Sequence, residues 1–169
     1  MTDNEGAAAA APADTQAQTG PQLALQTVYL KDCSFEAPNG PRVEGQWNPH
    51  INLDLQTAVN QLAPDFREVV LTVTVSAKQN DATVFLVEVK QAGVFLMRNL
   101  SQEDVKRAVG SICPSSLFPY ARAQVSQLVQ QGGFPQFLLP PVNFDALYAR
   151  SAAGAQPVAP QNGQAAAIG

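Results

Sequence analysis

The sequence predicts an α+β domain, in which a four-stranded antiparallel sheet carries one long, interrupted helix and a short C-terminal helix on one face. Four runs between residues 23 and 93 alternate apolar and polar side chains with the period of a strand. From residue 101 onward the apolar spacing lengthens to that of a helix. A block of strands followed by a block of helices is typical of an antiparallel sheet with its helices on one side.

The expected strands cover residues 23–35, 51–56, 67–76 and 83–93. Residues 37–50 form a long connection that contains three prolines and Trp47, and the polar residues 79–81 predict a hairpin between the last two strands. In the first strand, alternation predicts one face with Leu23, Leu25, Thr27, Tyr29, Cys33 and Phe35, and an opposite face with Val28, Leu30, Asp32, Ser34 and Glu36.

The helical part begins at Ser101, which has the spacing of a capping box with Asp104. Apolar residues follow at helical intervals until Pro114, which is expected to interrupt the helix. The helix resumes from Leu117, and the glycines at 132 and 133 end it. A short final helix is predicted after Asn143, which is a suitable N-cap.

Both ends of the chain are expected to be disordered tails, at residues 1–20 and 151–169. They consist mostly of Ala, Gln, Pro, Gly and Thr without periodicity, and the second carries no charge. Such segments bury too little apolar surface to offset the entropy lost on ordering. A single folded domain is therefore predicted over residues 21–150.

The charge balance argues against nucleic-acid binding. The net charge is -4, from 14 acidic and 10 basic residues, and Asp3, Glu5 and Asp14 lie in the N-terminal tail, which leaves 11 acids against the 10 bases. No basic patch stands out that could neutralise phosphates. No apolar run could span a membrane, and the first 20 residues lack the features of a secretion signal. We expect a cytoplasmic protein without direct membrane insertion.

Few residues could perform catalysis. His50 is the only histidine, and Cys33 and Cys113 are far apart in the sequence. Their spacing matches no familiar metal site, and the isolated glycines form no phosphate-binding loop. We therefore expect no cofactor, no metal and no enzymatic activity.

Three strings, in this order, carry a resemblance to a known family: DCSFEAPN at 32–39, CPSSLFPYAR at 113–122 and PPVNFDALY at 140–148. They are rich in aromatic residues, prolines and aliphatics, which suits shape and apolar contact better than chemistry. The strings resemble those of SecB, the bacterial export chaperone, and the resemblance covers roughly residues 23 to 150.

The resemblance implies an ATP-independent, cytosolic holdase that binds unfolded preproteins, keeps them translocation-competent and delivers them to the SecA translocase motor. It also implies a homotetramer built as a dimer of dimers. An alternative is a SecB-like chaperone dedicated to a single partner, such as the antitoxin of a toxin–antitoxin pair. A third and remote option is a small hydrolase that uses Cys33 or Cys113.

Alternation places Asp32, Ser34 and Glu36 on one face of the first strand, and Leu86, Glu88 and Lys90 on one face of the fourth. If both faces are the solvent side, the sheet presents a flat, partly acidic surface. The resemblance makes this surface the place where SecA docks, and the family's docking residues correspond to Asp32, Glu36, Leu86 and Glu88.

Two further sets of residues follow from the resemblance. A groove for extended, apolar client segments is expected to be lined by Val43, Trp47, Ile51, Leu53, Leu55, Phe144, Leu147 and Tyr148. The positions that affect oligomer assembly in the family correspond to Val87, Val89 and Gln91. Without the resemblance, the spacing of Phe144, Leu147 and Tyr148 shows only that they share one helical face. That face and Trp47 could equally pack on the domain's own sheet instead of binding a client.

Overall fold

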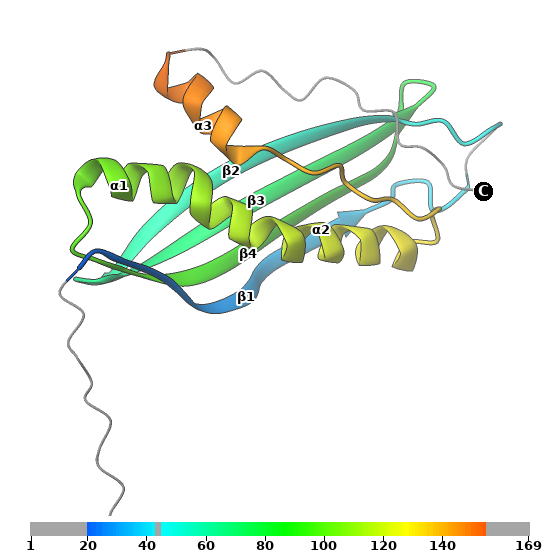
Figure 1. Ribbon diagram of the computed structural model, residues 1–169. Helices are drawn as coiled ribbons and strands as arrows, with labels where there is room; N and C mark the ends of the chain where they lie inside the picture. The colour runs from blue at the N-terminus through cyan, green and yellow to red at the C-terminus, as the bar shows by residue number, and fades with distance from the viewer. Residues whose placement is uncertain (1–19, 43–44, 155–169) are drawn as a thin grey trace, which may run out of the picture.

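The four strands form one antiparallel sheet in the order β1–β4–β3–β2, and the helices cover one of its two faces (Figure 1). The computed structural model describes residues 20–42 and 45–154, so nearly all of the two expected tails lies outside it. The strands are β1 (Gln22–Glu36), β2 (His50–Ala63), β3 (Phe66–Gln79) and β4 (Ala82–Arg98). β2 continues seven residues beyond the predicted strand, which ended at residue 56.

The helices are α1 (Gln102–Arg107), the π-helical segment η1 (Ala108–Ile112), α2 (Cys113–Gln131) and α3 (Phe144–Ala152). The first three form one continuous helix, so Pro114 does not break it. Instead the N–H of Cys113 bonds to the carbonyl of Ala108, which gives the wider turn of a π-helix just before the proline. α3 runs through Ala152, two residues past the expected end of the domain.

Both predicted helix caps are confirmed. The Ser101 hydroxyl accepts a hydrogen bond from the Asp104 N–H at 3.1 Å, and the Asn143 side chain accepts one from the Ala146 N–H at 2.9 Å. Each cap satisfies one of the backbone donors that a helix leaves unpaired at its start. The starts of α1 and α3 are therefore set by local sequence.

The core lies between the helix-covered face of the sheet and α2. The fully buried side chains come from alternate positions of the two central strands and from one stripe of the helix: Val69, Val73, Val75, Phe85, Val87, Val89, Leu117, Ala121, Val125 and Val129. The face of the sheet away from the helices, called the outer face below, has none of the described helices on it (Figure 1). One face of the sheet therefore forms the core, and the other is open in the described part of the chain.

One prediction about β1 is wrong, because the strand contains two β-bulges. Its pairing with β4 skips Gln26 and then Lys31, so that Leu30 lies opposite Gln91 and Asp32 lies opposite Lys90. Each extra residue reverses the alternation of the side chains that follow it. As a result Val28 and Leu30 lie on the helix side, and Thr27 and Tyr29 lie on the outer face, contrary to strict alternation over residues 23–35. Asp32, Ser34 and Glu36 keep their predicted common face.

Candidate functional site

The outer face brings the four predicted docking residues together. In the β1–β4 register Glu36 lies opposite Leu86, Ser34 opposite Glu88, and Asp32 opposite Lys90. The side chain of Asp32 is 58% exposed and that of Glu88 is 38% exposed, while Leu86 is half-buried. The result is an exposed acidic surface with an aliphatic side chain beside it, across two hydrogen-bonded strands.

Lys90 lies within this acidic surface. Its Nζ is 3.1 Å from Oδ2 of Asp32 and 3.4 Å from Oε1 of Glu88. Hydrogen bonds to Asp32 and then Glu88 raise the pKa of Lys90. Among the described residues, Glu36 has no ion pair. Two of the three predicted docking carboxylates are thus partly neutralised by the chain itself.

A second polar cluster, the Glu68 network, lies further along the outer face. Glu68 is only 6% exposed, and its carboxylate accepts hydrogen bonds from Lys31 at 2.7 and 2.8 Å, from Asn60 at 2.8 Å and from the Tyr29 hydroxyl. The hydrogen bonds from Lys31, Tyr29 and Asn60 lower the pKa of Glu68 to about 2. The bond to Glu68 is also the main cause that raises the pKa of Tyr29 to about 12. One carboxylate thus joins β1, β2 and β3, and holds the bulge residue Lys31.

The helix side carries the residues expected to bind clients, and one group of them centres on Trp47. Its ring lies 5.8 Å from that of Phe134, between ring centroids, and Phe134 lies 5.4 Å from the fully buried Phe85. Phe35 and Phe137 also pack on Phe85. Trp47 therefore rests on an aromatic cluster and is half-buried rather than free. The aromatics at 134 and 137, which follow the helix-ending glycines, were not among the predicted groove residues.

The β2 residues of the predicted groove share the helix side, since they pair with Val73, Val75 and Ala77 of β3. Leu53 is buried, and Ile51 and Leu55 are half-buried. The apolar side chains of this face continue with Val59, which lies opposite Val69 and is 45% exposed. Leu62, which is 57% exposed, is the unpaired residue at the bulge between Gln61 and Ala63. Neither was among the predicted groove residues, because the predicted strand stopped at residue 56. Val43 lies outside the described residues.

The α3 residues of the predicted groove pack on the long helix. Phe144 is buried edge-on against Phe118, at 5.7 Å between ring centroids, and Leu147 is half-buried. Tyr148 lies directly on Gly110, because a Cβ added there would be 2.4 Å from its Cδ2 atom. Phe144 and Trp47 belong to different aromatic clusters. The predicted groove residues therefore form three separate groups, one at Trp47, one on β2 and one on α3.

A Gly110→Ala substitution should displace α3. The new methyl group would overlap the Tyr148 ring, and overpacking of this kind costs about 1–3 kcal/mol of stability. Urea unfolding measures the loss, and proteolysis within residues 144–152 measures the exposure of α3. The Gly110→Ala, Tyr148→Ala double variant should recover the steric part of the loss. A Gly110→Ala variant as stable as the unaltered protein would show that Tyr148 does not lie on Gly110.

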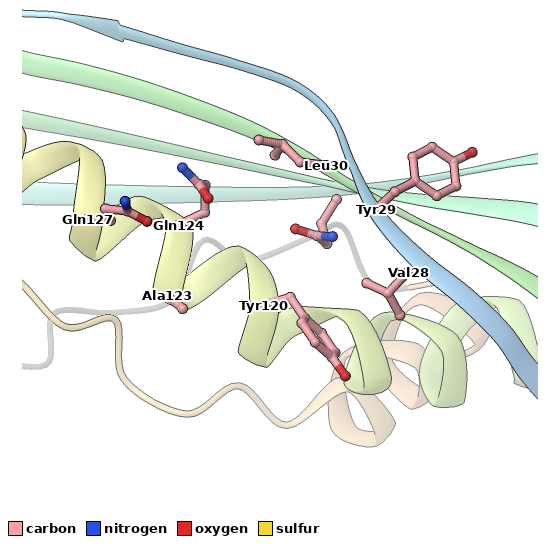
Figure 2. Close-up of a pocket in the computed structure, with 8 residues that line it drawn as sticks. Val28, Tyr29, Leu30, Tyr120, Ala123, Gln124 and Gln127 are labelled. Carbon is pink, nitrogen blue, oxygen red and sulfur yellow. The ribbon is translucent and has the colours of Figure 1, made fainter.

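The edge of the sheet at β1 forms a third surface together with α2. An open pocket of about 350 Å³ lies between them, lined by Val28, Tyr29, Leu30, Gln91, Tyr120, Ala123, Gln124 and Gln127. Figure 2 shows Val28 and Leu30 on the α2 side of β1, with the Tyr29 ring directed away from the helix. Leu30 and Tyr120 are exposed apolar side chains at this edge. The first β-bulge, at Gln26, therefore puts Val28 and Leu30 where strict alternation would have put Thr27 and Tyr29.

The three residues predicted to affect assembly lie just behind this edge. Val87 and Val89 are completely buried under α2, and Gln91 is 5% exposed in the wall of the pocket. The two valines cannot touch another protein directly. A substitution at either valine could affect assembly only indirectly, by shifting α2 or β1.

The two cysteines and the histidine do not form a reactive group. Burial raises the pKa of Cys113 to about 12, so its thiolate is scarce at neutral pH. Cys33 and His50 are exposed on different strands, at the two opposite edges of the sheet. Over the described ranges, no helix is long and apolar enough to cross a membrane.

Comparison with known proteins agrees with this description. The fold matches a solved structure of a SecB-like chaperone from Mycobacterium tuberculosis in complex with an antitoxin peptide, with a TM-score of 0.62 at 16% identity, over 71% of this chain and 90% of that one. At this identity the match establishes the fold alone. The fold is thus of the SecB-like chaperone class.

Sequence comparison is more specific. Residues 16–155 match the family model described as preprotein translocase subunit SecB. Protein-export protein SecB of Pseudomonas fluorescens (strain Pf0-1) is 46% identical over 151 residues, which cover 89% of this chain and 91% of the relative. Protein-export protein SecB of Pseudomonas aeruginosa (strain LESB58) is 51% identical over 138 residues, 80% of this chain and 85% of the relative. The chain belongs to the SecB family, and its function is that of a protein-export chaperone.

Proposed function

We propose that this chaperone is a cytosolic holdase, without enzymatic activity, that captures unfolded preproteins and hands them to SecA. The observation that carries the proposal is the separation of two kinds of surface. Apolar and aromatic side chains lie on the helix side of the sheet, and exposed carboxylates lie on the outer face. A client and a docking partner could therefore be bound at the same time, as a handover requires.

Client binding is assigned to the helix side, at Trp47, at the exposed part of β2 and along α3. An aromatic side chain buries about 150–250 Å², but ordering a flexible client consumes much of the gain. Each site should therefore bind weakly and with little sequence preference. Several sites on one oligomer that engage the same chain would raise the overall affinity. Because the complex holds the client in its unfolded form by mass action, no ATP is needed.

SecA docking is assigned to Asp32, Glu36, Leu86 and Glu88 on the outer face. The family resemblance implies that SecA reaches this surface with a basic, zinc-bearing tail. Exposed carboxylates attract such a tail, and the attraction weakens as salt screens it. The metal in this contact would belong to SecA.

A homotetramer, as a dimer of dimers, is assigned to the β1 edge and α2. β1 pairs with β4 only, so the backbone groups on its free edge and the apolar pocket beside it can meet another subunit. The surface rests on the buried side chains of Val87 and Val89, and Gln91 lines its pocket. The identities of 46% and 51% to export proteins favour general export over a chaperone dedicated to a single partner.

Light scattering of the purified protein, with and without a stoichiometric unfolded preprotein and without nucleotide, tests this function. We expect a species of about four chains that takes up the unfolded client but not its folded form. A monomer that ignores unfolded chains would reject the proposal, because the apolar side chains would then serve only the core. An oligomer that captures clients only with ATP would reject the holdase mechanism.

A further inference from the structure

We propose that Lys90 regulates the docking face by occupying it, so that a partner's cations must displace the chain's own ammonium group from Asp32 and Glu88. This inference rests on the proposed docking of SecA to the outer face. In this inference, Lys90 weakens the contact between SecA and the outer face and makes that contact selective.

The geometry makes Lys90 the direct competitor. It lies opposite Asp32 in the β1–β4 register and two residues from Glu88 on the same face of β4. Its Nζ approaches both carboxylates, at 3.1 and 3.4 Å, and its side chain is 38% exposed. An incoming ammonium or guanidinium group would need the same carboxylate oxygens and would meet a like charge beside them.

In the described part of the sheet, no other cation forms an ion pair with Asp32 or Glu88. Lys31, the nearest lysine along β1, is held by Glu68, and Arg98 is paired with Asp65 at 2.8 Å. Among the described residues, Glu36 keeps its carboxylate without an ion pair. The docking face therefore offers one unpaired carboxylate at Glu36 and two that Lys90 shields.

This arrangement should favour a partner that brings several cations at once. A single positive charge gains little by exchanging places with Lys90, whereas a cluster of positive charges can engage Glu36 and then replace Lys90 at the other two carboxylates. Such competition is a form of selection against weakly basic proteins. Its cost to the proper partner is modest, because ion pairs on an exposed surface are individually weak.

Calorimetric titration of the full-length protein with purified SecA, at low and moderate salt, tests the inference. The Lys90→Gln variant should bind SecA about two- to fivefold more tightly than the unaltered protein, with a steeper loss of affinity as salt increases. The matched control is Lys106→Gln, which removes the same charge from an exposed position of α1, on the helix side. This control should bind SecA as the unaltered protein does. A gain in affinity cannot arise from damage to the fold.

The outcomes separate the inference from the function on which it rests. If Lys90→Gln gains nothing, or if Lys106→Gln gains as much, the competition by Lys90 is rejected. A Glu88→Lys variant in the same assay tests the docking face itself. Loss of SecA binding in Glu88→Lys without a gain in Lys90→Gln keeps the docking face and rejects the role of Lys90. Normal binding by Glu88→Lys rejects the docking face.

Discussion

A Glu88→Lys variant should lose SecA binding and still capture unfolded preproteins. Glu88 lies on the outer face opposite Ser34, 3.4 Å from the Nζ of Lys90. A lysine there would place two positive charges side by side where a basic partner is expected. Reversal of a charge at such a contact should weaken SecA binding at least about tenfold. Titration with SecA and suppression of client aggregation, on the same preparation, measure the two activities.

Two further variants sharpen this experiment. Leu86→Arg alters the neighbouring aliphatic side chain on the same face and should have the same selective effect. Glu103→Lys makes the same charge change at an exposed position in the first turn of α1 and should leave SecA binding intact. Loss of both activities together in Glu88→Lys, with an unchanged circular dichroism spectrum, would contradict the assignment of SecA and clients to separate surfaces.

A Glu68→Gln variant should be less stable by about 2 kcal/mol at pH 7, because the buried side chain loses the charge that strengthens its hydrogen bonds from Lys31, Tyr29 and Asn60, while the exposed ammonium of Lys31 stays hydrated. The pKa of Glu68 is lowered to about 2 from an ordinary value of 4.5. Its contribution to stability is therefore complete above about pH 4.5 and disappears as the pH falls toward 2. The difference in the free energy of unfolding between the two proteins should shrink over that interval. Urea unfolding at several pH values measures it.

Glu103→Gln is the control for this second prediction, since it removes an exposed carboxylate from α1. Its free energy of unfolding should differ little from that of the unaltered protein at any of these pH values. If Glu68→Gln is as stable as the control at pH 7, the Glu68 network does not hold β1 to β3. If the difference persists unchanged at pH 2, its origin is not the charge of Glu68.

Features that depend on neighbours in the sequence were predictable. The caps at Ser101 and Asn143, the hairpin before β4 and the alternation within β3 and β4 each involve residues a few positions apart. The family resemblance rests on local strings as well, and the four residues that it predicts for docking are brought together on the outer face by the register. The interruption expected at Pro114 takes the form of one π turn just before it, and the helix continues past the proline.

By itself, the sequence determined the class of fold, the order of its elements, the family and the acidic character of one face. Only the tertiary structure decided which way residues 27–30 point, that Lys90 bridges Asp32 and Glu88, and that Glu68 is surrounded by Tyr29, Lys31 and Asn60. The physical reason is that a bulge and a cross-strand ion pair depend on pairing between strands. The pairs Lys31–Glu68 and Asp32–Lys90, for example, are 37 and 58 positions apart in the sequence, and no local pattern records them.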